Sequence, residues 1–166
     1  MNRRRCLAYL GTVCAAFASL ATSDPAWELD DRVGPWNDTL SAATPEVVRH
    51  FGVESTEEHT LRVSGLLRWD PTPAAVVRIS ITKDDASPAM EAVYRADEAD
   101  GTTTTVALGQ HEECSAKPCQ QGYSVRLRLE DGAPQEQVTF AWSASALMEG
   151  SGDSPPKGAY VKLTED

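Results

Sequence analysis

The feature that most constrains the fold is a strict alternation of apolar and polar residues along the chain. It is clearest in residues 61–65, 77–81, 123–129 and 138–144. A period of two places successive side chains on opposite faces of a strand, so each run has one apolar and one polar face. Such runs are typical of antiparallel sheets that bury one face and expose the other.

Turns rich in proline, glycine and aspartate separate the runs. Their spacing predicts strands over residues 59–69, 75–83, 90–96, 102–108, 122–130 and 136–147. We therefore expect an all-β protein, an antiparallel β-sandwich of jelly-roll or immunoglobulin-like topology with about seven or eight strands. Phe140 and Trp142 are predicted core residues. Tyr123 is expected to bury its ring while its hydroxyl bonds the backbone.

Two segments at the borders of this pattern are less regular. Residues 44–52 fit a short helix that Gly52 would end, or a strand on which Val47 and Phe51 share one side. We favour the strand because a short polar turn joins it to the next predicted strand. Residues 159–163 follow a loop of glycine, serine and proline and are predicted to form a last edge strand.

The first 21 residues have the composition of a secretory signal peptide. Arginines at positions 3–5 precede an apolar stretch over residues 6–20, and small residues around Ala21 suit signal peptidase. The stretch is shorter than the roughly 20 residues of a membrane-spanning helix. We therefore expect cleavage after Ala21 and export to the periplasm or the extracellular space. The alternative is a lipid anchor on Cys14, although Val13 is bulky for the residue before a lipidated cysteine.

Beyond the signal, the chain divides into residues 22–44 and residues 45–166. The first segment mixes proline, glycine and aspartate without a clear period, which predicts an irregular leader, and the second is the predicted β-sandwich domain. Trp27 and Trp36 lie in the leader and are candidate partner-binding residues. Either they bind a partner, or they fold back over an open edge of the sandwich, which is the outcome we expect.

The formal charge of −10 narrows the range of partners. Nucleic acid and anionic lipid surfaces both select clustered lysine and arginine, and an acidic chain offers the opposite balance. We therefore expect no nucleic-acid partner and no docking on a membrane through a basic face.

Cys114 and Cys119 are the only cysteines beyond the predicted signal peptide. Four residues ending in Pro118 separate them, and a proline turn at this spacing can bring the two sulfur atoms together. In an oxidising compartment such a pair predicts a disulfide bond. The alternatives are a reactive thiol and a metal site with His111, which would lack the fourth ligand of a closed zinc site.

No set of residues has the spacing of a catalytic site. The chain has three histidines, His50, His59 and His111, and it has no Gly-x-Ser-x-Gly motif or phosphate-binding glycine loop. The acidic run 97–101 suggests a calcium loop, but its acids fall at the first, second and fourth positions rather than at alternate ones. We predict no catalytic residue, no bound metal and no cofactor.

Two stretches resemble a family of exported bacterial domains. They are FGVESTEEHTLRVSGLLRWD (residues 51–70) and CQQGYSVRLRLEDGAPQEQVTFAWSASA (residues 119–146). Residues 122–127 are similar to the Gly-Tyr-x-Val-x-Val strand, followed by a final hairpin, of pre-peptidase C-terminal domains. Those domains are β-sandwich accessories of secreted enzymes, and fibronectin-type and immunoglobulin-like modules share much of the pattern. The acidic strand motif of the family is replaced here by residues 76–81, which contain no acid.

These observations favour an exported, non-catalytic β-sandwich module. We expect it to bind a protein or glycan partner, or to have a structural role in the cell envelope or outside the cell. The alternative is a calcium-dependent, lectin-like binding domain, because acidic residues are scattered in the predicted loops. A hydrolase accessory subunit is a third possibility, which only the family resemblance suggests.

Overall fold

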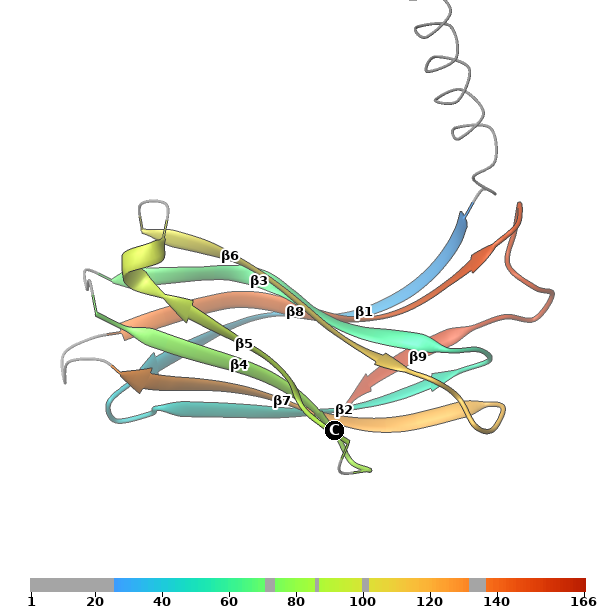
Figure 1. The fold of residues 1–166 in the computed structure, drawn as a ribbon, viewed down its shortest axis with the longest axis horizontal. Coiled ribbons are helices and arrows are strands. Elements are labelled where there is room, and N and C mark those ends of the chain that lie inside the picture. The colour runs from blue at the N-terminus through green and yellow to red at the C-terminus, as the bar shows by residue number, and fades with distance from the viewer. Residues whose placement is uncertain (1–25, 71–73, 86, 100–101, 132–136) are drawn as a thin grey trace, which may run out of the picture.

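The computed structural model describes residues 26–70, 74–85, 87–99, 102–131 and 137–166, which form a β-sandwich (Figure 1). The strands are β1 (Ala26–Ser41), β2 (Glu46–Ser55), β3 (His59–Asp70), β4 (Val76–Lys83), β5 (Met90–Arg95), β6 (Thr103–Glu112), β7 (Cys119–Asp131), β8 (Gln137–Ser151) and β9 (Val161–Glu165). One turn of 3-10 helix, η1 (Ala96–Glu98), follows β5. The predicted all-β class and sandwich architecture are confirmed, with slightly more strands than expected.

The strands wind as a jelly roll. One sheet has the order β1-β8-β3-β6, and the other has the order β5-β4-β7-β2-β9. The antiparallel partners are β1 with β8, β2 with β7, β3 with β6, and β4 with β5. This nesting of early with late strands arises when one long hairpin rolls up across two sheets, and it distinguishes the jelly roll from the immunoglobulin-like alternative. β9 extends the five-stranded sheet beside β2.

Nearly all consecutive strands lie in different sheets. Among the described strands, only β4 and β5 follow one another in the chain and also pair within one sheet. The hairpin that the family resemblance implies after residues 122–127 is therefore wrong, because β7 and β8 belong to opposite sheets. A polar turn between two alternating runs can join neighbouring strands of one sheet or strands of opposite sheets. The sequence pattern therefore does not distinguish a hairpin from a crossing between sheets.

The predicted irregular leader is wrong for residues 26–41, which form β1, a strand of 16 residues. β1 pairs with β8 along its length, with a register shift between Val33 and Trp36. Gly34 lies in this shift with a φ of 104°, a conformation that favours glycine. An inserted residue of this kind is a β-bulge, and it reverses which residues face inward. The bulge divides the alternation into two short halves, which hid the strand from sequence analysis.

The segment around Phe51 forms β2, so the favoured strand is confirmed and the helix alternative is excluded. β6 continues to Glu112, further than the sequence pattern predicted. β9 confirms a last edge strand close to the predicted place.

The inner faces of the two sheets pack into one core. Its largest fully buried side chains are Trp142, Tyr123, Phe51, Phe140, Leu40, Leu61, Leu67, Ile79, Ile81, Leu127, Met148 and His59. Phe140 and Trp142 are thus confirmed as core residues. The Tyr123 ring is buried as expected, but its hydroxyl bonds His59 Nε2 at 2.9 Å rather than the backbone. β3 brings His59 across from the opposite sheet, a neighbour that local sequence does not reveal.

The predicted signal peptide (residues 1–21) and the alternative lipid anchor at Cys14 lie outside the described residues. Both therefore stay predictions. In the part of the chain that the structure describes, no helix has the length and apolar character to cross a membrane.

Candidate functional site

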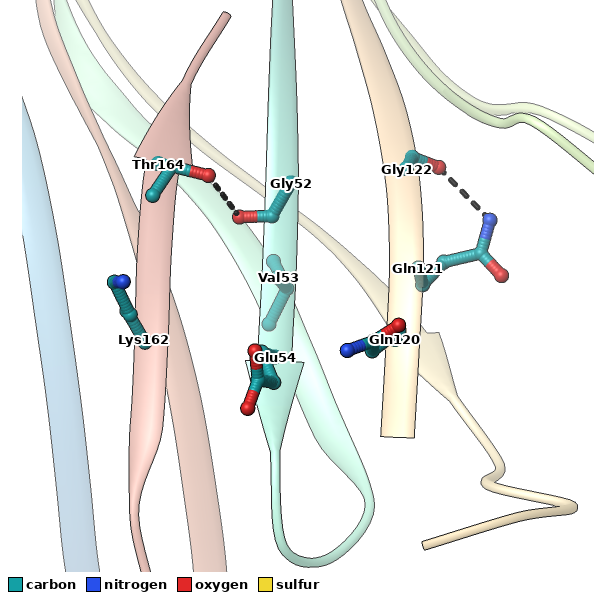
Figure 2. Close-up of a pocket in the computed structure, with 8 residues that line it drawn as sticks. All are labelled: Gly52, Val53, Glu54, Gln120, Gln121, Gly122, Lys162 and Thr164. Atoms are coloured by element: carbon teal, nitrogen blue, oxygen red, sulfur yellow. Dashed lines mark hydrogen bonds between the residues drawn. The ribbon is translucent and has the colours of Figure 1, made fainter. Parts of the chain in front are cut away.

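A shallow trough crosses the outer face of the five-stranded sheet over β9, β2 and β7, with a volume of about 390 Å³ (Figure 2). Two rows of outward-facing residues from adjacent strands build it. The rows are Thr164–Gly52–Gly122 and Lys162–Glu54–Gln120. Each row exists because the strand register places its three members directly opposite one another.

Two glycines form the floor of the trough. Gly52 and Gly122 face each other across β2 and β7, so neither strand places a side chain of its own at this point. At one end, Thr164 Oγ1 donates a hydrogen bond to the Gly52 carbonyl at 3.2 Å. At the other end, the Asp84 carboxylate occupies the space that a Cβ on Gly122 would take. A glycine inside a strand marks a place where another group approaches the backbone closely.

The second row forms a polar wall beside this floor. Glu54 Oε1 accepts a hydrogen bond from the Tyr160 hydroxyl at 2.5 Å, and this bond raises the pKa of Tyr160. Gln120 and Lys162 form no side-chain hydrogen bond or ion pair with any residue that the structure describes. Figure 2 shows the side chains of Glu54, Gln120 and Lys162 in neighbouring positions on the three strands. The wall therefore combines a carboxylate, an amide and an ammonium group with unused hydrogen-bonding capacity.

A second polar cluster lies inside the sandwich, between the two sheets. His59 Nδ1 is 2.8 Å from Ser55 Oγ, and His59 Nε2 is 2.9 Å from the Tyr123 hydroxyl. Ser55 Oγ donates to the Glu57 carbonyl at 2.7 Å. Because the Ser55 proton is committed there, His59 Nδ1–H donates to Ser55, and His59 Nε2 accepts from Tyr123. The three hydrogen bonds are complete only when the imidazole is neutral.

Burial keeps His59 in this neutral form. The side chain is 1% exposed, and its desolvation lowers the pKa to about 4 despite the opposing charge of Glu112. Protonation would place a second donor at Nε2, opposite the proton that Tyr123 donates. Both ring nitrogens are thus committed to partners within the fold, which is the setting of a structural histidine rather than of a solvent-accessible base.

The predicted disulfide is confirmed, since Cys114 and Cys119 are bonded with sulfur atoms 2.11 Å apart. The histidine nearest to it is His59, with a ring nitrogen within 4.8 Å of both sulfurs. His111, the third ligand of the alternative metal site, instead has Nδ1 3.2 Å from Thr60 Oγ1 at the surface. Two sulfurs bonded to each other are not thiolates, so this oxidised pair offers no metal site.

The two candidate tryptophans have different surroundings, and the structure does not bring them together. The Trp36 ring packs against the core, with its centroid 4.6 Å from Trp142 and 5.6 Å from Phe51. The Arg49 guanidinium lies over it, 4.8 Å from the ring centroid. Asp38 fixes this cluster, because it accepts hydrogen bonds from Trp142 Nε1 at 2.7 Å and from Arg49 Nη2 at 2.9 Å.

Trp27 is the second residue of β1. Figure 1 shows that the start of this strand and the end of β8 rise away from the five-stranded sheet. The Trp27 ring covers Gly150, the residue opposite it on β8. It borders a hollow whose rim includes Glu57, Glu58 and Glu149. Each of these carboxylates already lies beside a basic side chain. The bulge in β1 is what allows both tryptophans, which are an odd number of residues apart, to face the same side of the strand.

Two neighbouring acids, Asp84 and Asp85, lie in the turn that follows β4. Asp85 Oδ1 accepts a hydrogen bond from the Ser87 backbone N–H at 2.9 Å, and the bonds from Ser87 lower the pKa of Asp85. Asp97 and Glu98 lie in η1, and the last two residues of that run are outside the described residues. Of these acids, Asp84 is the one that reaches the trough.

Sequence reasoning missed the trough. The sequence pattern marks Gly52 as the end of the alternative helix and Gly122 as part of a strand motif, and it indicates a trough at neither. The available signal was a glycine inside each alternating run, which indicates a close approach to the backbone. That the two glycines meet follows from the pairing of β2 with β7, which lie far apart in the sequence.

Comparisons with known proteins add little to this description. No protein-family model and no curated protein matches the chain. Among solved structures, a chain of the structure titled "Structure of infectious bursal disease virus Gx strain" is similar, with a TM-score of 0.42 and 11% sequence identity. The match covers 86% of this chain and 36% of that one, so this chain spans about a third of its length. A likeness at this level carries no inference about function.

Proposed function

We propose that this chain is an exported, non-catalytic module that binds a glycan in the trough across β9, β2 and β7. The observation that carries the proposal is the floor at Gly52, where no side chain covers the backbone, beside a wall of polar side chains with unused hydrogen-bonding capacity. Ligand sites usually combine a concave surface with a few well-placed polar groups.

The chemistry of the wall suits a sugar. Each sugar hydroxyl both donates and accepts hydrogen bonds, and neighbouring hydroxyls form pairs. Planar groups such as the Glu54 carboxylate and the Gln120 amide can bond such pairs, and the Lys162 ammonium donates to hydroxyl oxygens. The absence of a side chain at Gly52 lets a sugar ring lie close to the backbone there.

A protein partner is less well supported at this place. Protein interfaces are centred on buried aromatic or aliphatic anchors. Of the large apolar side chains exposed in the described residues, only Tyr160 is tied to the trough, through its bond to Glu54. The wall itself is charged and polar.

Two further elements of the proposal rest on separate observations. Export is supported by the disulfide, because such bonds persist in non-reducing compartments, and by the signal-like composition of residues 1–21. His59 is unsuited to act as a catalytic base, because Ser55 and Tyr123 occupy both of its ring nitrogens inside the core.

The test is a screen of the mature protein on an array of immobilised neutral and charged oligosaccharides, followed by calorimetric titration with the best oligosaccharide. Gly52→Thr places a β-branched side chain on the floor and should weaken binding about tenfold or more, because the close approach to the backbone is lost. The matched control is Gly109→Thr on β6. Its added Cβ would lie 3.2 Å from Thr60 Cγ2, whereas the Cβ added at Gly52 would lie 3.1 Å from Thr164 Oγ1.

Two results contradict the proposal: no binding to any oligosaccharide, or equal loss of binding in both variants. Repeating the titration with calcium and with EDTA separates the calcium-dependent, lectin-like alternative. Binding that EDTA abolishes favours that alternative, because no step of the proposed contact requires an ion.

A further inference from the structure

The two edge strands of the five-stranded sheet differ in whether another part of the chain bonds their outward-facing backbone groups. At the β9 edge, the Leu163 backbone N–H donates to Asp31 Oδ2 at 2.9 Å, so a side chain of β1 covers part of the edge strand. At the opposite edge, β5 pairs only with β4. Among the described residues, no backbone group of β5 bonds a strand on its other side. An open edge of this kind is a template for another strand.

Exposed apolar side chains lie along this edge. Met90 is 43% exposed and Val93 is 40% exposed, so two of the most exposed apolar residues of the described chain lie on one six-residue strand. Val93 shares the outer face with Glu91 and Arg95, which flank it at equal distances along the strand. Neither a lysine nor a proline interrupts the strand, although both are common devices against edge pairing.

We propose that β5 pairs antiparallel with β5 of a second copy of this chain, about a two-fold axis through Val93. In this register Val93 lies opposite Val93 of the second copy, and Glu91 lies opposite Arg95 of the second copy on both sides of the axis. Opposite charges directly across an antiparallel pair stabilise it, and two-fold symmetry forms each contact twice. The edge is thus complementary to itself in charge, in apolar contact and in backbone hydrogen bonding.

The ion pairs that Glu91 and Arg95 form within one chain do not prevent the contact between the two copies. Glu91 Oε2 bonds Arg78 Nη1 on β4 at 2.7 Å, and Glu91 Oε1 has no partner among the described residues. Arg95 Nε lies 3.9 Å from Glu98 Oε1, a separation too long for a hydrogen bond, and both side chains are more than half exposed. Arg95 can therefore turn to a neighbouring strand without losing a strong contact.

The pairing joins two five-stranded sheets into one continuous sheet. Because the two-fold axis is perpendicular to that sheet, both copies turn the same face to the same side. The two β2 strands would then lie about 34 Å apart at the usual spacing between strands. If the troughs bind glycan, which rests on the proposed function, the dimer presents two of them to one surface and gains avidity.

The test is sedimentation velocity of the mature protein over a range of concentrations. Wild type should form dimers at high concentration. Arg95→Glu and Glu91→Lys should each raise the dimer dissociation constant about tenfold or more, because each turns two attractive cross-strand pairs into repulsive ones. An equimolar mixture of the two variants should recover dimers, since every pair in the mixed dimer again joins opposite charges.

The matched control is Val48→Lys, at an apolar residue that is 36% exposed on β2, inside the sheet rather than at its edge. This variant should dimerise like wild type. A wild type that stays monomeric at its highest soluble concentration overturns the proposal, and so does a mixture of the two charge variants that stays monomeric. Circular dichroism checks that each variant is folded. The glycan titration with Gly52→Thr is independent of these outcomes, so failure of either proposal is recognised separately.

Discussion

The inner and outer faces of β2 and β7 both carry polar groups, but the groups are arranged in opposite ways. On the inner side, Ser55 and Tyr123 bond His59, and every donor and acceptor of this set has a partner within the fold. On the outer side, Gln120 and Lys162 lie beside the floor at Gly52, and their side chains have no partner among the described residues. Adjacent residues such as Gly122 and Tyr123 thus belong to different environments because strand side chains alternate.

The contrast separates structural polar groups from candidate binding groups. A buried donor or acceptor without a partner is costly, so a polar group in the core persists only when the fold satisfies it. A surface group has water as an alternative and need not be satisfied by the protein. Spare hydrogen-bonding capacity around a concave floor is therefore informative about ligands, whereas the His59 cluster is informative about stability.

The largest expected effect is on the inner face. Phe51→Ala should reduce the free energy of unfolding by about 3–5 kcal/mol, because it leaves a cavity beneath Trp36 and Trp142. Urea denaturation followed by tryptophan fluorescence measures this change. Val48→Ala on the outer face of the same strand is the control and should change stability by less than about 1 kcal/mol. Equal losses at the two positions would contradict the assignment of inner and outer faces.

The next effect is a dependence of stability on pH that arises from His59. Its pKa in the folded state is lowered to about 4 from the ordinary value of 6.5, so between these values the unfolded chain binds more protons. The contribution of neutral His59 to the free energy of unfolding is fully present above pH 6.5 and is lost as the pH falls towards 4. Its size is about 3 kcal/mol, following from the shift in pKa.

His59→Gln removes this titration and keeps a polar side chain at the position. The loss of unfolding free energy between about pH 7 and about pH 4 should be smaller in the variant than in wild type by about 3 kcal/mol. His111→Gln, at an exposed histidine, is the control and should follow wild type. Parallel pH profiles for wild type and His59→Gln would show that His59 titrates normally.

The smallest effect is expected in the trough. Gly52→Thr should change the free energy of unfolding by only about 0.5 kcal/mol, because the added side chain points outward and its Cβ has a single close neighbour, Thr164 Oγ1 at 3.1 Å. Thermal denaturation monitored by circular dichroism checks this. A small change in stability together with lost glycan binding would assign the trough to function. A large loss of stability would assign Gly52 to folding instead.

Much of the fold follows from local pattern. The alternating runs predicted most of the strands, and the core positions of Phe140 and Trp142 are confirmed. The disulfide between Cys114 and Cys119 also follows from local spacing, because only four residues separate the cysteines. The strand β1 was missed because Gly34 and the adjoining bulge reverse the alternation in its middle. The period of two holds on each side of the bulge but with opposite phase.

The candidate site depends on contacts between distant segments. Each of its two glycines was visible in the sequence, yet neither indicated a trough by itself. The floor exists because β2 pairs with β7, and the wall is completed because β9 joins the other side of β2. The neighbour of Tyr123 was also unpredictable, because His59 reaches it from a strand of the opposite sheet.

Local sequence is enough to predict most of the strands, their apolar faces and the pairing of the two cysteines. These properties depend on neighbours two to five residues away. The jelly-roll order, the complete hydrogen bonding of His59, the trough and the open edge at β5 arise only from contacts between distant segments. An alternating pattern makes a strand able to pair with any other, and only the packing of the whole core selects the partners and their register.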